Sequence, residues 1–157
     1  VSMDELVAAI LAWTAERLPD TTARLAGPTD AGDGGVLLYA LGLRSSAELR
    51  NSQPRRDPIV DLLEASFLVS FRHADPLAAV QAAADFHFAA LEGAPFTVDA
   101  GADPLALTRH LGLPPAIGLV VVGRVLRQRA VQPIPLVREH RVNLRDRAAL
   151  EDGGQHA

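Results

Sequence analysis

The sequence predicts an α+β domain in which a mostly antiparallel sheet carries helices packed on one face. Three observations lead to this fold class. Residues 36–43 are uniformly apolar, residues 59–72 alternate between apolar and polar side chains, and helical segments with clear end signals surround them. The elements follow the order α β β α (β) α β β. The chain of 157 residues suits one domain, expected over residues 1–147, followed by a disordered tail, 148–157.

A first helix is expected over residues 3–18. Ser2 and Glu5 have the spacing of a capping box, and Pro19 ends the helical pattern. Apolar side chains recur along one stripe of this helix, which therefore faces the core. They are Leu6, Ile10 and Trp13 in line with Arg17, widened by Val7, Leu11 and Leu18. The glycine-rich stretch 27–35 follows as a flexible loop.

The two best strand candidates, residues 36–43 and 59–72, are expected to pair antiparallel. The first is apolar throughout, which is typical of a strand buried on both faces. In the second, one alternating set is apolar and the other is mostly polar, which predicts one buried and one solvated face. The apolar set is Leu63, Ala65, Phe67, Val69 and Phe71, and the polar set is Glu64, Ser66, Ser70 and Arg72, interrupted by Leu68.

A second helix begins after Asp75, its expected N-cap, has Pro76 at its first position and ends at Gly93. Large apolar side chains recur at helical spacing, and we expect them to form its core-facing stripe. The stripe consists of Leu77, Val80, Ala84, Phe88 and Leu91.

The remaining elements are shorter. Residues 95–100 predict a short strand, and residues 103–112 repeat the Asp-Pro start and Gly stop in a short helix. Residues 116–126 are a third main strand, and residues 136–145 a weaker fourth one, set off by two prolines.

The composition bounds the class of protein. Aromatic residues make up 4% of the chain, so the core is expected to consist mostly of Leu, Val and Ala. There is no cysteine, which excludes disulfides and thiolate chemistry. No apolar run reaches the roughly 18 residues that span a bilayer, and the first residues lack the features of a signal peptide. We therefore expect cytoplasmic synthesis and no membrane partner.

Charge is unevenly distributed along the chain, whose net charge is −4. Residues 1–43 and 58–120 are acidic, whereas residues 44–57 and 121–147 are basic, and every basic residue is an arginine. A net acidic chain without a recognition helix or stacking aromatics is not expected to bind nucleic acid. The alternation instead suits contacts between complementary protein surfaces.

No pattern of residues predicts catalysis, a cofactor or a metal. His73 and His87 flank Asp75 and Asp85, but no two histidines have the i, i+4 spacing of a helical metal site. We expect His73 on the surface and His87 half-buried. The glycine-rich stretch precedes a strand, whereas a phosphate loop follows one, and there is no G-x-S-x-G sequence. The chain is not expected to be an enzyme.

Between the two best strand candidates lies a polar, arginine-rich segment, residues 44–57, which we call the polar bridge. Arg50, Arg55 and Arg56 supply forked donors, and Asn51 both donates and accepts. The prolines in this bridge favour an extended backbone before them. Two interpretations remain open from the residues alone, an exposed hairpin tip and an arm that contacts another protein.

The stretch "LLYALGLRSSAELRNSQPRRDPIVDLLEASFLVSF", residues 37–71, resembles the tail-terminator, or cap, family of contractile injection systems. These are phage-tail-like particles of the antifeeding-prophage and Photorhabdus virulence-cassette type. The similarity covers about 35 residues, and Phe67 and Ser70 stand where the family pattern has Tyr and Thr. The matching positions are Leu37-Leu38-Tyr39, Leu49-Arg50-Asn51, Pro54-Arg55-Arg56 and Phe67-Leu68-Val69-Ser70-Phe71.

The resemblance implies a structural role. Family members form a hexameric ring on the distal end of the inner tube and the contractile sheath and stop polymerisation. The implied partners are further copies of this chain, sheath subunits and inner-tube subunits, within a particle assembled in the cytoplasm. With the charge pattern, it makes the following arginines and asparagine candidate interface residues: Arg50, Asn51, Arg55, Arg56, Arg138 and Arg141.

Three alternatives remain open beside this interpretation. A tail-completion protein of a contractile phage follows the same structural logic. A small binding module with a pocket between sheet and helices belongs to a different class, as does a hydrolase that uses Asp85, His73 and His87.

Overall fold

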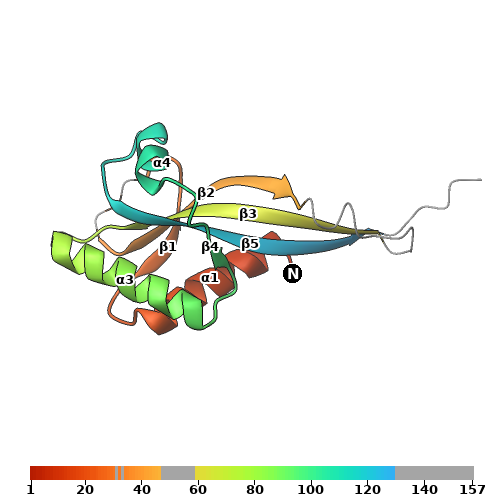
Figure 1. Ribbon diagram of the computed structural model, residues 1–157, viewed down its shortest axis with the longest axis horizontal. Helices are drawn as coiled ribbons and strands as arrows, with labels where there is room; N and C mark the ends of the chain where they lie inside the picture. The colour runs from red at the N-terminus through yellow and green to blue at the C-terminus, as the bar shows by residue number, and fades with distance from the viewer. Residues whose placement is uncertain (31, 33, 47–58, 130–157) are drawn as a thin grey trace, which may run out of the picture.

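The computed structural model describes residues 1–30, 32, 34–46 and 59–129, which form three helices and one five-stranded sheet (Figure 1). The sheet order is β1-β2-β3-β5-β4. The elements are α1 (Met3–Arg17), β1 (Ala23–Ala26), β2 (Val36–Ser45), β3 (Ile59–Phe71), α3 (Pro76–Glu92), β4 (Thr97–Val98), α4 (Pro104–His110) and β5 (Ile117–Arg129).

The sheet is mostly antiparallel, so the predicted α+β class is confirmed. β2 pairs with β3, β3 with β5, and β5 with β4, all antiparallel. β1 adds a parallel edge strand beside β2, although the local sequence predicts no strand there. The short connection between these two strands turns at Gly35, whose φ is +83° and whose Cβ, if present, would lie 2.4 Å from the Thr22 carbonyl oxygen. Only glycine fits this turn without strain.

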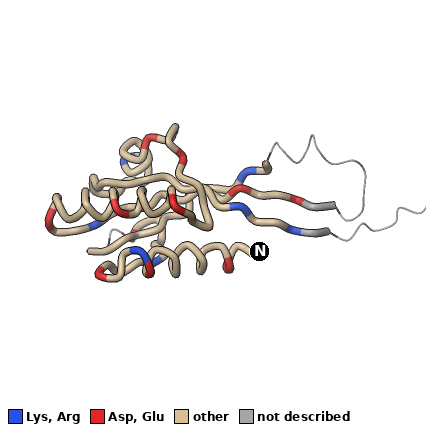
Figure 2. The backbone as a smooth tube through the Cα atoms, turned by 60° about the horizontal axis from the view of Figure 1, so that its bottom comes forward, with Lys and Arg blue, Asp and Glu red and all other residues tan. Residues whose placement is uncertain are grey.

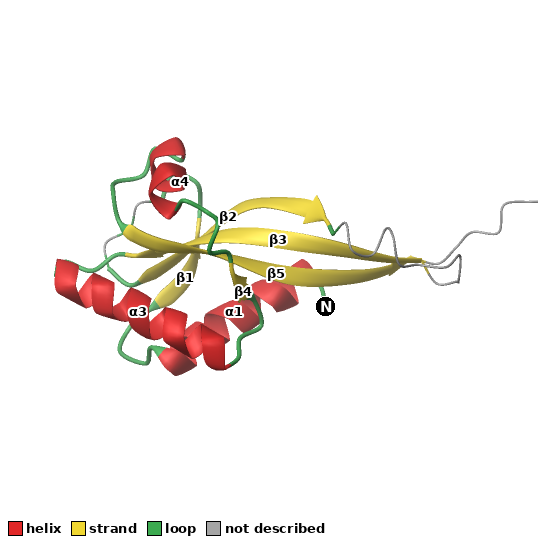
Figure 3. Cartoon of the chain, in the orientation of Figure 1, coloured by secondary structure: helices red, strands yellow, loops and turns green. Residues whose placement is uncertain are grey.

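The two long helices, α1 and α3, cover one face of the sheet (Figure 3). Between them and the sheet lies the larger core, with four of the chain's few aromatic rings at its centre. The ring of Phe86 lies 5.5 Å from Phe71, 5.4 Å from Phe96 and 5.2 Å from Trp13. The Trp13 indole also donates to the Gly93 carbonyl over 2.9 Å, which ties α1 to the end of α3. The predicted core side of α1 is confirmed, since Leu6 and Ile10 are buried.

A second, smaller core lies on the opposite face, beneath the short helix α4. It contains Leu37, Tyr39, Leu68, Leu113 and Val120. The prediction that this face of β3 is solvated is therefore wrong over the last part of the strand, where Ser70 is buried. Leu68, which interrupts the polar set of β3, is fully buried in this smaller core.

The predicted core stripe of the second helix is also wrong. α3 has the expected caps, with the Asp75 carboxylate accepting from the Leu77 backbone N–H, but it is rotated so that Ala79, Ala82, Ala83 and Phe86 are buried. Small alanines let the helix lie close to the sheet, and Phe86 is the residue of α3 that joins the aromatic cluster. The large apolar residues are left outside: Leu77, Val80, Phe88 and Leu91 are exposed, and Ala84 is half-buried.

The central strands are longer than the body that covers them. Val36 to Tyr39 of β2 are buried, but Leu43 is 62% exposed, so the prediction of a strand buried throughout holds only for its first half. β2, β3 and β5 continue out of the body as an extension that we call the projecting ribbon, residues 42–45, 59–64 and 124–129 (Figure 1).

Several predictions concern residues outside the described ranges and stay predictions. They are the strand at 136–145, the domain limit at 147 and the tail 148–157. Within the described ranges, no helix is both long and apolar enough to cross a lipid bilayer.

A candidate assembly surface on the projecting strands

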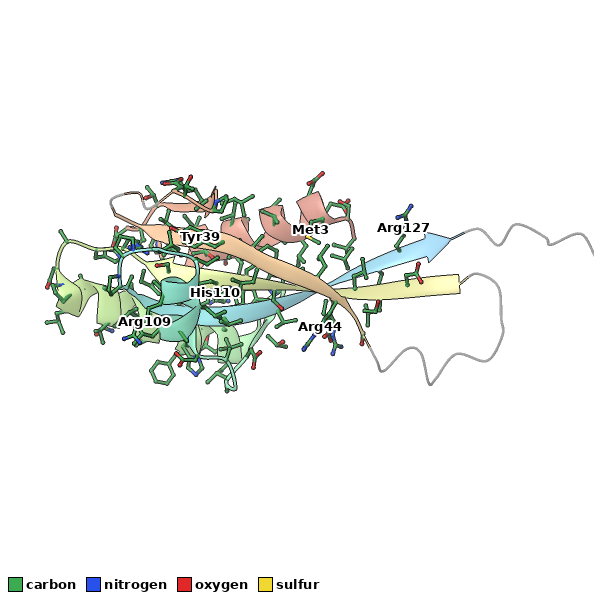
Figure 4. All side chains as sticks on the ribbon, turned by 90° about the horizontal axis from the view of Figure 1, so that it is seen from above. Met3, Tyr39, Arg44, Arg109, His110 and Arg127 are labelled. Carbon is green, nitrogen blue, oxygen red and sulfur yellow. The ribbon has the colours of Figure 1, made fainter. Side chains whose placement is uncertain are left out.

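The projecting ribbon is the part of the described structure that is best placed to contact another protein. Seen from above the sheet, Arg44 and Arg127 lie on the ribbon, whereas Tyr39, Arg109 and His110 lie on the body (Figure 4). Leu63 and Val125 at the base of the ribbon still pack against the larger core, and beyond them no described helix covers the strands (Figure 1). Figure 2 shows that basic and acidic positions lie beside each other along these strands.

One row across the ribbon is an ion-paired triad. Arg44, Glu64 and Arg124 stand opposite one another on β2, β3 and β5. The Arg44 Nε donates to Glu64 Oε2 over 2.7 Å, and Arg124 Nε lies 3.7 Å from Glu64 Oε1. The Glu64 side chain is 12% exposed, so the two more exposed arginines cover it. The triad joins the three strands at the base of the ribbon, on the face opposite the larger core, and it leaves a basic outer surface.

Beyond this row, the ribbon combines apolar and charged positions. Leu62 pairs with Leu126, and Asp61 stands opposite Arg127. Leu126 is 51% exposed and shares the face of the triad, whereas Leu43, which stands opposite Ala65 on the body side of the triad and on the other face, is 62% exposed. Both faces of the ribbon therefore carry an exposed leucine, and on one of them it lies beside the arginines of the triad, a combination found at protein contact surfaces.

The candidate interface residues all lie outside the described ranges, so their positions stay predictions. In the sequence, however, they adjoin the strands of the ribbon. Residues 47–58, with Arg50, Asn51, Arg55 and Arg56, join the end of β2 to the start of β3. Arg138 and Arg141 follow the end of β5.

The positions of the family resemblance that the structure describes lie in the body. Tyr39 is buried, and its hydroxyl donates to the Asp30 carbonyl oxygen, while burial raises the pKa of this hydroxyl above its ordinary value. Phe67 and Val69 belong to the larger core, and Leu68 to the smaller one. These matched residues therefore build the fold rather than a contact.

The residues of the hydrolase alternative are not joined into a catalytic group. Asp85 accepts a hydrogen bond from Gln81 over 2.8 Å. His87 Nδ1 and His73 Nε2 are buried and have no hydrogen-bond partner in the described part of the chain. The prediction that His73 lies on the surface is wrong, because it is half-buried. Across the described ranges, no three His, Asp or Glu side chains gather as metal ligands do.

A cavity of about 1040 Å³ opens at the end of the body, between the start of α3, the start of α4 and the start of β5. Its walls include Phe71, Val80, Leu105 and Ile117. Arg72 also lines it, with its Nε donating to Ser70 Oγ over 3.1 Å and its Nη2 without a partner among the described residues. A mostly apolar cavity with such a donor suits a ligand that carries an apolar group and an anionic or carbonyl oxygen.

Comparisons by sequence find no relative: no protein-family model matches the chain, and no curated protein matches it. Solved structures do match it in three dimensions. One is the sheath/tube terminator of an extracellular contractile injection system, PVC, in the extended state, with a TM-score of 0.66 and 16% identity over 99% of this chain and 73% of that one. Another is the anti-feeding prophage cap, a tube terminating cap, with a TM-score of 0.66 and 12% identity over 89% of this chain.

This chain spans 62% of the length of the anti-feeding prophage cap. At these identities the match concerns the fold, and it confirms the tail-terminator-like architecture expected from residues 37–71. The body, the helices on its faces and the sheet topology are thus those of a tube-terminator fold.

Proposed function

We propose that this protein is a structural terminator subunit that caps the end of the inner tube and contractile sheath of a phage-tail-like particle. The observation that carries the proposal is the match to two tube terminators over 99% and 89% of the chain. The projecting ribbon, with exposed leucines beside arginines, supports a role that depends on contacts rather than on catalysis.

The proposed mechanism follows from the geometry of polymer ends. A tube or sheath grows because each subunit offers the surface that the next one binds. A terminator binds that surface through its ribbon but presents a different one outward, so growth stops. Copies of the chain would form a closed ring, with six members as in the family it resembles, through a head-to-tail interface. The basic segments would meet acidic surfaces of neighbouring subunits.

The test is an assembly experiment with inner-tube and sheath subunits from the same genome. The labelled full chain is added during polymerisation, and particle lengths and label positions are measured by electron microscopy. We expect label at one end of each particle and shorter particles as the chain is added. Particles whose lengths do not change and whose ends carry no label at saturating chain would overturn the proposal.

A matched pair of variants tests the ribbon itself. Leu43→Asp with Leu126→Asp changes two exposed ribbon positions and is expected to abolish end binding. Leu25→Asp changes an exposed leucine of β1, 49% exposed and away from the ribbon, and is expected to bind as the unchanged chain does. Equal binding by both variants would count against the ribbon.

The cavity favours a second candidate, a small binding module of a different class. Its test is a screen of carboxylates and phosphate esters for stabilisation of the fold. A ligand that binds only the folded chain raises the free energy of unfolding by about 2.7 kcal/mol at one hundred times its dissociation constant, and the melting temperature rises with ligand concentration. Loss of that stabilisation in Arg72→Leu would support this candidate. A chain that is stabilised by none of the ligands but caps tubes would exclude it.

A further inference from the structure

The outer side of α3 is a continuous apolar stripe that nothing in the described structure covers. Phe88 is 65% exposed, Leu91 70%, Leu77 73% and Val80 47%. These residues recur at i, i+3, i+11 and i+14, so they lie along one line of the helix. The stripe lies opposite the buried alanines and Phe86. An exposed row of large apolar side chains costs solubility and marks a contact surface.

The rim of this stripe is acidic. Asp85 and Glu92 lie next to it on the helix, with Glu92 Oε2 3.9 Å from Arg17 Nη1 of α1, and Asp75 stands at its start. From residue 73 to residue 108 there are five acids and neither lysine nor arginine. The partner that fits is therefore apolar and basic.

The chain itself contains one segment of that chemistry. Residues 130–147 include the apolar residues Val131, Ile134, Leu136, Val137, Val142 and Leu144. They also carry Arg138, Arg141, Arg145 and Arg147 against two acids. Eighteen residues span up to about 60 Å when extended, which exceeds the roughly 25 Å length of a 17-residue helix.

The placement of the two surfaces favours a contact between copies. Residues 130–147 follow β5, which ends on the projecting ribbon, whereas α3 covers the body and its first turn lies at the opposite end of the long axis (Figure 1). A segment that leaves one copy at its ribbon meets the α3 face of the next copy in a head-to-tail arrangement. Such a heterologous contact repeats from copy to copy and closes a ring when the rotation permits.

We propose that the outer face of α3, with Leu77, Val80, Phe88 and Leu91, is the docking surface for the arginine-rich segment 130–147 of a second copy of this chain. The leucines, valine and phenylalanine of the stripe bury the apolar residues of the segment, and Asp85 and Glu92 pair with its arginines. The inference deepens the proposed function, since it names where the subunits of the proposed ring meet.

The absence of cysteine in the chain makes disulfide trapping a clean test. One full-length chain carries Leu91→Cys, a second chain of different mass carries Val137→Cys, and the two are mixed under mild oxidation. We expect a covalent heterodimer to form on the order of tenfold faster than from the control pair, because docking holds the two thiols at a high local concentration. The control replaces Leu91→Cys by Ala12→Cys, an exposed position on the outer side of α1.

Heterodimer formation at the control rate would overturn the proposal. A doubly substituted chain, Leu91→Cys with Val137→Cys, separates the other possibility. If its disulfide closes within one chain at a rate independent of dilution while the mixed chains stay unlinked, the segment covers its own α3 and the proposal is wrong.

Charge reversal provides an independent arm. Asp85→Arg with Glu92→Arg should slow heterodimer trapping to the control rate, and Arg138→Glu with Arg141→Glu in the other chain should restore it. Restoration does not follow if the stripe binds a tube or sheath subunit instead. Trapping between copies without capping of tubes would leave this inference standing and defeat the proposed function, whereas capping without trapping would do the reverse.

Discussion

Gly123 determines how closely α1 approaches the sheet. A Cβ at this position would lie 2.7 Å from both terminal carbons of Leu6, a buried core residue. We expect Gly123→Val to lower the free energy of unfolding by about 1–3 kcal/mol, because the extra carbons overpack the core beneath α1. Urea denaturation measures this change.

The matched control is Gly42→Val, at a position of β2 where a Cβ meets nothing within 4 Å. This variant should be as stable as the unchanged chain or slightly more stable. If both variants lose the same stability, strand position rather than the contact with Leu6 explains the effect.

Asp30 is expected to titrate at unusually low pH. The Arg24 guanidinium, which donates to its carboxylate, and the Gly32 backbone N–H lower the pKa of Asp30 from 3.8 to about 2. A carboxyl whose pKa is lower in the folded state stabilises the fold above pH 4, and this contribution is lost as the pH falls through about 2. NMR titration of the Asp30 carboxyl carbon measures the midpoint.

In Arg24→Ala, the pKa of Asp30 should rise towards 3.8 but stay below it, because the Gly32 N–H still donates. A midpoint that does not move on this substitution would mean that the ion pair does not form in solution.

At the scale of elements, α3 offers two phenylalanines two residues apart with opposite environments. Phe86 is fully buried in the aromatic cluster, whereas Phe88 is 65% exposed. Phe86→Ala is expected to cost about 3–5 kcal/mol of folding free energy, as for other buried aromatic residues, and Phe88→Ala should cost little. Thermal denaturation of the two variants, at a concentration where the chain is monomeric, measures these losses of stability. Similar losses for both would contradict the orientation of α3 in which Phe86 is buried and Phe88 exposed.

The rotation of α3 shows why periodicity alone misjudged this helix. The helix α3 has two apolar faces, one with large side chains and one rich in alanine. Hydrophobicity favours burial of the large face, but a helix that must lie close to both α1 and the sheet is better packed through alanines. The competition depends on the distance between elements, which no local pattern contains.

At the scale of the whole molecule, charge separation is the feature with the clearest consequence. The α3 side of the body is acidic, while the ribbon and the segment that follows it are rich in arginine. We expect self-association of the full chain to weaken as salt is raised, since exposed charges are screened beyond about 10 Å at 0.1 M ionic strength. Sedimentation velocity at low and high salt measures the change in mean mass.

A purely apolar contact would show the opposite trend or none. The Arg138→Glu, Arg141→Glu chain serves as the control, because it should be less associated at low salt and less sensitive to salt. If it matches the unchanged chain, these arginines do not contribute to association.

The sequence by itself determined the approximate limits of the described elements other than β1, their order, and the antiparallel pairing of β2 with β3. These features depend on local signals: Ser2, Asp75 and Asp103 cap helices, and alternation along β3 identifies a strand. The residues that resembled a terminator were mostly those that build the sheet, so the fold could be anticipated. The candidate contact residues at 47–58 and beyond 129 stay predictions.

Only the tertiary structure decided which faces are buried. It added β1 as a parallel edge, closed the second face of the sheet beneath α4, turned the large side of α3 outward and let three strands run beyond the body. Each of these outcomes depends on how closely elements far apart in the chain approach one another. Burial is a property of that packing, and a local pattern can propose a face but cannot choose its partner.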